Sequence, residues 1–400
     1  MRKLIALCLT TVLLAGCSAG TKAPAGPAPK ATDKPVELTL HVAFGSQREA
    51  LDDAIEVYEN KHPNTKIRVR ELPMQQMMTK DGAMNTAVIE EGDLVLLPEG
   101  QALSLWNAGK LRDLSSVRAP QLGELAAPLF DELGKADGKR YGLPVAITPG
   151  MLMYNADAFA KAGVKVPTVD WTVQEFEQTL GALKAAGATY NLTSGLLIEP
   201  IVRAYGGQMY DPARQAWAFD TPEAKAGLGL MGRLTKAGII EVEGGAKVRV
   251  MIGNGPGAPT LTALPLNLNV QMPGMTFLPY PKGPGGRSVP ASAQVGGVLS
   301  TSANPEAATD FLKELISDPT MQMALAKGGV RPLINDSKAL AAWTEAVGDQ
   351  TARATELSLQ DAYVGSQVPA LAEALTGLEP FFKGTATLEE IVPGLIARLK

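Results

Sequence analysis

The sequence predicts an α/β fold with two or three domains. Segments with the two-residue period of strands alternate along the chain with segments of helical spacing, a pattern typical of mostly parallel sheets. The 400 residues are enough for two or three full-sized cores. Hydrophobic residues make up 46% of the chain and charged residues 20%, which is ordinary for a globular protein. We find no internal repeat.

The first elements follow from residue spacing. Residues 36–44 place alternate apolar side chains on one strand face. A capping-box pattern, Ser46 to Glu49, predicts the start of the first helix. Residues 66–71 predict a second strand, and residues 93–98 a buried third strand. Further helices are expected after three cap residues, of which the last two precede a proline: Thr172, Thr221 and Asn304.

The N-terminus has the pattern of an exported lipoprotein. Two basic residues precede an apolar run of 11 residues, Leu4 to Leu14, which is too short to span a bilayer. The run ends in Leu-Ala-Gly-Cys17, which resembles the bacterial lipobox, and this resemblance implies cleavage after residue 16 and lipidation of Cys17. The alternative is an ordinary signal peptide with an accidental cysteine. Residues 17–35 are rich in Ala, Pro, Gly and Lys, and we expect the lipidated cysteine and a flexible, solvated tether there.

Charge and composition argue against several function classes. A formal net charge of −4 offers no basic surface for nucleic acid. His41 and His62 have no Cys or carboxylate partners at metal-ligand spacing, so no metal site is expected. The chain has no Gly-x-Ser-x-Gly motif, and its two separated histidines argue against a catalytic triad. We therefore expect no catalytic residues, and a secreted hydrolase is the least supported class.

The glycine-rich stretch MIGNGPGAPT, residues 251–260, has the glycines of a nucleotide-binding loop without the context that such a loop needs. A dinucleotide fingerprint opens a helix, whereas Pro259 follows these glycines, and no Lys-Ser or Lys-Thr pair follows as in a P-loop. The stretch KGPGGRS, residues 282–288, fails the same tests. Prolines and glycines at this density indicate turns, and no cofactor is expected.

Five stretches, in order along the chain, carry a resemblance to a known family. They begin at Phe44 (FGSQREALDDAIEVYENKHPNTKIRV), Gly92 (GDLVLLPEGQALSLWNAGKLRDL), Tyr141 (YGLPVAITPGMLMYNADAFAKAGV), Ala204 (AYGGQMYDPARQAWAFDTPEAKAGL) and Asn304 (NPEAATDFLKELISDPTMQ). Together, behind the lipobox, they resemble the bacterial extracellular solute-binding proteins of family 1. These proteins are lipoprotein receptors of ABC importers, and many of them bind sugars.

The resemblance implies a two-lobed, periplasmic-binding-protein-like fold whose lobes are built from discontinuous chain. One lobe is expected from residues 36–147 and 274–330, and the other from residues 148–273 and 331–400. Crossing strands would act as hinges, with the ligand in the cleft at the carboxyl ends of the strands. The expected partners are a small polar solute, an ABC permease with its ATPase, and the membrane through the lipid anchor. We expect a monomer.

Four positions where the family commonly has a tryptophan hold other residues. Gly255-Pro256 matches the start of a Gly-Pro-Trp loop, but Gly257 follows; the other three positions fall at Gly150, within residues 294–298 and within residues 365–369. Each aromatic face is worth about 1 kcal/mol beyond its buried area, so losing several costs roughly a thousandfold in sugar affinity. This departure favours a smaller polar or anionic solute over a typical oligosaccharide. It also keeps open a non-transporting lipoprotein that acts through a protein partner such as a membrane sensor.

Polar residues near strand ends are the candidate ligand contacts, and each has a structural alternative. The three residues Ser46, Gln47 and Arg48 follow the first strand at a helix N-terminus, which suits an anion or hydroxyl, or they only cap the helix beside a solvated arginine. Glu99, after the third strand, accepts from ligand hydroxyls or is a solvated loop carboxylate. Thr148 lies in the crossing segment and binds ligand or its own backbone.

The remaining candidates lie further along the chain. Tyr205 precedes two glycines and reaches the cleft or is buried in the core. Asn254 and Gly255 belong to a loop that forms a cleft wall, and Gln294 lies at a strand end, where it binds ligand or only completes the strand. Arg331, beside the third crossing, binds an anion or braces the hinge.

Overall fold

The computed structural model describes most of the chain after the predicted tether. The described residues are 35–43, 48–72, 74–77, 85–89, 91–118, 121–188, 190–191, 194–211, 213–240, 261–263, 275–365 and 371–399. The predicted contacts Ser46, Gln47, Asn254 and Gly255, and the predicted lipidation site Cys17, lie outside them.

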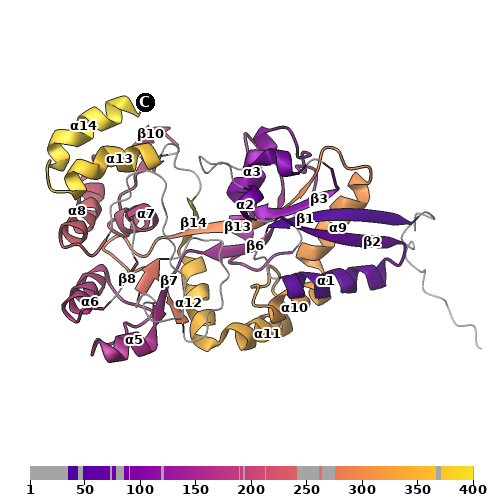
Figure 1. Ribbon diagram of the computed structural model, residues 1–400, viewed down its shortest axis with the longest axis horizontal. Coiled ribbons are helices and arrows are strands. Elements are labelled where there is room, and N and C mark those ends of the chain that lie inside the picture. The colour runs from indigo at the N-terminus through magenta and orange to yellow at the C-terminus, as the bar shows by residue number, and fades with distance from the viewer. Residues whose placement is uncertain are drawn as a thin grey trace, which may run out of the picture.

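The molecule is elongated, and a mixed sheet forms the centre of one half (Figure 1). Its strand order is β14-β13-β3-β1-β2, and β6 pairs with the other edge of β13. The pairs β1–β2, β1–β3 and β13–β14 are parallel, whereas β13 runs antiparallel to β3 and β6. The strands are β1 (Val36–Ala43), β2 (Thr65–Leu72), β3 (Leu94–Pro98), β6 (Leu143–Pro149), β13 (Val289–Val298) and β14 (Ala362–Val364).

Helices from both ends of this part of the chain pack around the first sheet. The amphipathic α1 buries Ala50, Leu51, Ala54 and Ile55, and α9 buries Phe311 and Leu315, both in a core cluster that includes the strands. The helices and short strands of this half are α1 (Arg48–Lys61), α2 (Met74–Met77), a 3₁₀ turn (Thr86–Val88), α3 (Glu99–Asn107), α4 (Ala127–Glu132), β4 (Lys135–Ala136), β5 (Lys139–Arg140), α9 (Pro305–Ser317) and α10 (Pro319–Lys327).

The other half has a smaller sheet of order β12-β7-β11-β8, in which only β11–β8 is parallel. The prediction of mostly parallel sheets is therefore wrong for this half, because β7 follows β6 directly and β11 and β12 run back along it. The elements are β7 (Leu152–Asn155), α5 (Ala156–Lys161), α6 (Val173–Ala185), β8 (Tyr190–Asn191), α7 (Ser194–Ala204), β9 (Tyr210–Asp211), β10 (Ala216–Trp217), α8 (Pro222–Lys236), β11 (Leu261–Ala263), β12 (Met275–Leu278), α13 (Leu371–Phe382) and α14 (Leu388–Arg398).

All three predicted helix starts are confirmed, although one of them lacks a side-chain capping bond. Thr172 forms a complete capping box with Glu175, and Thr221 caps the Ala224 amide ahead of a proline at the first helical position. Asn304 precedes α9, but its side chain makes no capping bond. Instead, the Ser302 hydroxyl accepts a hydrogen bond from the Asn304 amide at 3.1 Å.

The two halves have separate hydrophobic cores. One cluster joins β1, β3, β6 and most of β13, and the other joins β7, α6, α7, α8 and α13. Leu278, Tyr280 and Val289 belong to the second cluster, so we propose a lobe boundary within β13 in place of the one expected at residue 274. We likewise propose that the boundary expected at residue 331 lies later in the chain, because Leu333 and Leu359 pack in the first cluster.

A third, small cluster joins α10 to α11 (Ser337–Val347) and α12 (Asp349–Gln360), and α12 lies beside the strands β6 and β13 that run between the two halves. From these contacts we propose two lobes in place of the expected residue ranges. The chain passes from one lobe to the other at β6–β7, within β13 and at β14. In the part of the chain that the structure describes, no helix is long and apolar enough to cross a membrane.

Replacing glycine by alanine at two positions of α8 is expected to change the stability of the protein in opposite directions. A Cβ on Gly227 would lie 2.6 Å from the Val202 Cα of α7, whereas a Cβ on Gly229 would meet nothing within 4 Å. We expect Gly227→Ala to lower the free energy of unfolding by about 1–3 kcal/mol through overpacking. Gly229→Ala is expected to raise it by up to about 1 kcal/mol, because alanine favours the helix. Urea unfolding of both variants checks this, and equal stabilities would contradict the α7–α8 contact.

Candidate functional site

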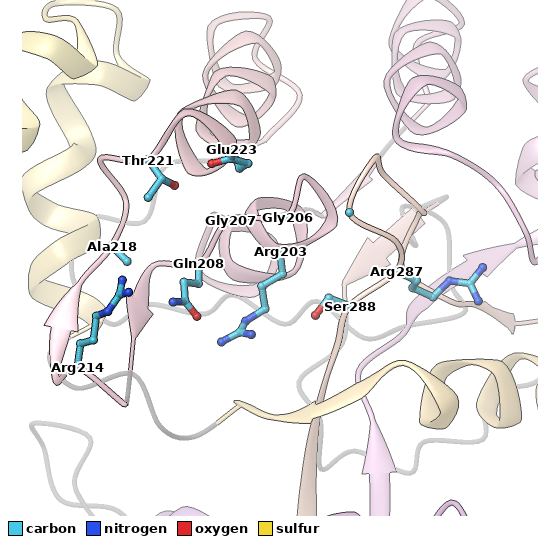
Figure 2. Close-up of a pocket in the computed structure, with 11 residues that line it drawn as sticks. Arg203, Gly206, Gly207, Gln208, Arg214, Ala218, Thr221, Glu223, Arg287 and Ser288 are labelled. Atoms are coloured by element: carbon cyan, nitrogen blue, oxygen red, sulfur yellow. The ribbon is translucent and has the colours of Figure 1, made fainter.

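A cavity of about 450 Å³ lies where β13 leaves the second lobe (Figure 2). The end of α7, the β9–β10 hairpin, the start of α8 and the loop before β13 form its walls. Its volume is in the range of small-molecule sites. The lining residues are Arg203, Gly206, Gly207, Gln208, Arg214, Ala218, Thr221, Glu223, Gly285, Arg287 and Ser288.

Glycines allow two loops of the wall to meet backbone to backbone. A Cβ on Gly285 would lie 2.4 Å from the Gly206 amide nitrogen, so neither loop has room for a side chain at this contact. The Gly285 amide donates to the carbonyl of Ala204 at 2.8 Å. The stretch KGPGGRS is thus a turn that packs on the end of α7, as its proline and glycine content predicts.

Arg203 is the central cation of the site. Its Nε donates to Glu199 Oε1 at 2.6 Å, and its guanidinium carbon lies 4.1 Å from the centre of the Tyr363 ring. Glu199 is only 5% exposed and also accepts from the Met209 amide at 3.1 Å. Burial raises the pKa of the Glu199 carboxyl above its ordinary value, and Arg203 opposes that rise. One edge of the guanidinium is therefore held by Glu199 while its side chain stays 25% exposed beside the cavity.

The other two arginines of the lining are also paired with carboxylates. Arg214 lies 3.6 Å from Asp211. The buried Arg287 donates to the Tyr280 and Val169 carbonyls and lies 3.3 Å from Asp170. Figure 2 shows Arg287 pointing away from the space toward which Arg203, Gln208 and Ser288 turn. Because each cation has a carboxylate partner, the cavity has little uncompensated positive charge to attract an anion.

One face of β13 begins beside the cavity. Ser288 lines the cavity, and strand alternation places Pro290, Ser292 and Gln294 on the same side. The opposite side, Ala291 and Ala293, is buried in the first core cluster. We call the first side the polar face of β13.

Neighbouring strands extend this polar face. Thr148 of β6 lies opposite Ser292, and Tyr363 of β14 lies opposite Pro290. Ser292 Oγ and Gln294 Oε1 are buried, and neither has a hydrogen-bond partner in the described part of the structure. Buried polar atoms usually have partners, but the described residues hold other unpartnered atoms away from this face, among them Gln101 Oε1 and Ser358 Oγ.

Three residues that were predicted to contact a ligand make contacts within the protein instead. Glu99 is 5% exposed rather than solvated, and it accepts from the Gly134 amide at 3.3 Å and from the Tyr141 hydroxyl. Tyr205 is partly buried and packs against the second core cluster, which matches the core alternative. Arg331 donates to Glu356 at 2.7 Å and to the Pro332 carbonyl at 3.0 Å, which matches the hinge-brace alternative.

Of the other predicted contacts, Arg48 lies outside the site and two lie in it. Arg48 donates to both oxygens of Asp52 at 2.8 Å on the exposed side of α1, the solvated alternative. Gln294 lies on the polar face of β13, and Thr148 lies opposite Ser292 on the same face. Sequence reasoning missed Arg203, Gln208, Ser288, Ser292 and Tyr363. The run Ser288 to Gln294 shows polar or proline residues at every second position, and that signal could have found the face.

Comparisons with known proteins agree on one fold. The sequence profile described as bacterial extracellular solute-binding protein matches residues 44–322. A putative binding protein of Brucella abortus is 43% identical over 51 residues, which are 13% of this chain and 12% of that protein. The match thus spans only a small part of that relative's length.

Two solved structures are similar over nearly their whole length. The ABC substrate-binding protein from Listeria monocytogenes, in complex with cycloalternan, has a TM-score of 0.69 at 18% identity, covering 91% of this chain and 98% of that one. The cyclic alpha-maltosyl-1,6-maltose binding protein from Arthrobacter globiformis has a TM-score of 0.68 at 18% identity, covering 91% and 97%. The predicted periplasmic-binding-protein-like α/β fold is confirmed.

The buried carboxyl of Glu199 predicts a pH dependence. Its pKa is raised in the folded state, so the folded protein holds this proton to higher pH than the unfolded chain does. The contribution of Glu199 to stability is therefore greatest below its ordinary pKa and falls as pH rises through the raised value. We expect the stability of Glu199→Gln relative to the unsubstituted protein to increase with pH above about 4.5. Urea unfolding from pH 4 to 8 measures this, and a constant difference would contradict it.

Proposed function

The chain belongs to the bacterial extracellular solute-binding protein family, and on this premise we propose that it is a receptor that closes two lobes on a small polar solute and delivers it to an ABC importer. The protein is a non-enzymatic solute receptor. The chain passes between the two lobes at β6–β7, β13 and β14, and these connections suit hinges.

The observation that carries the proposal is the cavity at the start of β13 together with the polar face that begins beside it. Arg203, Gln208 and Ser288 turn toward one space in the second lobe. Gln294, further along the same strand, pairs with Pro98 of β3 in the first lobe. A solute that contacts both ends is held by both lobes and stabilises the closed state.

Sugars are the favoured solutes. The two solved relatives are described with sugar ligands, cycloalternan and cyclic maltosyl-maltose. The cavity itself supports a neutral solute, because its three arginines are already paired with carboxylates. The anionic solute that the sequence left open is thus less favoured than a hydroxyl-rich one.

Gln208 provides the test of the cavity. Its side chain lines the space without a hydrogen bond in the described residues, so Gln208→Ala should leave the melting temperature unchanged. Loss of one hydrogen bond to solute lowers affinity by about 2–10-fold. Isothermal titration calorimetry with a sugar found by thermal-shift screening measures the change. Gln121→Ala, on the exposed surface of the first lobe, is the matched control. Equal affinities of both variants would remove the cavity from the proposal.

A flat thermal-shift response to every sugar in the screen would favour the alternative function, a lipoprotein that acts through a protein partner. A ligand at a hundred times its dissociation constant stabilises by about 2.7 kcal/mol, which is readily measured.

The membrane anchor remains part of the proposal. It rests on the lipobox and on the tether composition of residues 17–35. Two or more acyl chains on Cys17 give stable anchoring, whereas one chain gives marginal binding. We expect Cys17→Ser to lose incorporation of labelled palmitate and to move from the membrane fraction to the released fraction. If Cys17→Ser still incorporated palmitate and Cys8→Ser did not, the lipid would be on Cys8 and the prediction would be wrong.

A further inference from the structure

A second cavity, of about 610 Å³, lies between the last two helices, α13 and α14. These helices form the end of the second lobe that lies opposite β1 and β2 in Figure 1. In the described part of the chain, no residue lines both this cavity and the one beside β13. Its volume suits a small molecule, and the proposed receptor function does not use it. We call it the helix-hairpin cavity.

The floor of the helix-hairpin cavity is apolar. The two helices touch closely, because a Cβ on Gly377 would lie 2.2 Å from Leu395 Cδ1. Leu395 is only 2% exposed, and Pro380 and Ile391 line the cavity about one turn further along each helix. Such a floor removes the apolar side chain of a ligand from water.

One end of the cavity has two charges of opposite sign. Arg398 Nη2 would lie 3.0 Å from a Cβ on Gly377, and Glu373 precedes Gly377 by one helical turn on the same face. Glu373 and Arg398 are exposed, and within the described residues neither side chain makes a hydrogen bond or an ion pair. The other three carboxylates of these helices have partners: Glu379 pairs with Lys383, Glu389 pairs with Lys225, and Glu390 accepts from Thr387.

Two opposite charges one helical turn apart fit a ligand that has both. The ammonium group of an α-amino acid can donate to Glu373 while its carboxylate accepts from the Arg398 guanidinium. From Glu373 to Pro380, α13 rises over seven residues, about 10 Å at roughly 1.5 Å per residue. That length holds one amino acid whose side chain lies along the apolar floor. An internal residue of a bound protein segment lacks both terminal charges, so a free amino acid fits better.

We propose that the helix-hairpin cavity binds a free α-amino acid with an apolar side chain, at a site separate from that of the transported solute. Glu373 binds the ammonium group, Arg398 binds the carboxylate, and the floor covers the side chain. The site goes beyond the proposed receptor function and does not depend on it. Because both charged side chains are exposed, we expect a dissociation constant of about 1 mM.

Gly394 allows the cavity to be filled without disturbing the fold. It is an exposed residue of α14 that lines the cavity, and a Cβ there would meet nothing within 4 Å. Gly394→Leu should leave the melting temperature unchanged or raise it, because leucine favours a helix more than glycine does, while its side chain occupies the place of the ligand. Gly181→Leu of α6 is the matched control, since that glycine is also exposed, its Cβ would also meet nothing within 4 Å, and it lies outside the cavity.

Saturation-transfer NMR of leucine measures the binding. The full-length protein is held in phosphatidylglycerol nanodiscs, because detergent would compete for an apolar cavity. We expect Gly394→Leu to weaken leucine binding by about tenfold or more and Gly181→Leu to leave it unchanged. N-acetylleucine and leucinamide, which each lack one of the two charges, should bind about 2–5-fold more weakly than leucine.

Substitution of the two charged residues separates ligand binding from a structural role. Glu373 lies in the first turn of α13 and Arg398 in the last turn of α14, so each also complements the dipole of its own helix. A ligand contact has a further consequence. Arg398→Gln should lose the preference for leucine over leucinamide, and Glu373→Gln should lose the preference for leucine over N-acetylleucine. These two variants decide the question if Gly394→Leu melts at a lower temperature.

Three results would overturn the site and leave the receptor function standing. They are no binding of leucine by the unsubstituted protein, equal binding by a stably folded Gly394→Leu, and unchanged preferences in Arg398→Gln and Glu373→Gln. Weaker leucine binding by Gln208→Ala, with normal binding by Gly394→Leu, would place leucine in the cavity beside β13. That result would support the receptor function and contradict the separate site.

Discussion

The two chemically different sides of β13 are the constraint on which the rest of the structure depends. Ala291 and Ala293 bury one side in the first core cluster, while Ser292 and Gln294 occupy the other. A shift of one residue in register would exchange these sides, placing polar atoms in the core and methyl groups on the site. Pairing with β6, β3 and β14 on its two edges fixes the register. The core of the first lobe and the floor of the site are thus set by the same hydrogen-bond ladder.

Carboxylate pairing has a similar organising effect in the second lobe. Arg203 is held between Glu199 and the Tyr363 ring, which links α7 to the crossing strand β14. Arg287 is buried at the start of β13 and contacts Asp170 at 3.3 Å and Asp361, just before β14, at 3.7 Å. Buried ion pairs add little net stability, but each fixes the position of its elements because a misplaced partner leaves a buried charge. The two crossing strands are therefore positioned against the second lobe by charge as well as by backbone pairing.

The sequence predicts the fold class and several helix starts because those features depend on local patterns. The Thr172 capping box and the Thr221-Pro222 start need only residues within one turn, and both are present. The site depends on contacts between distant segments, which spacing does not contain. Glu99 follows a strand as a ligand contact would, yet residues 134 and 141 bury and bond it. Arg331 likewise donates a hydrogen bond to Glu356, which lies 25 residues later in the chain. Gln294 was expected at a strand end but lies within β13, and the alternation of residues 288–294 would have indicated the face on which it lies.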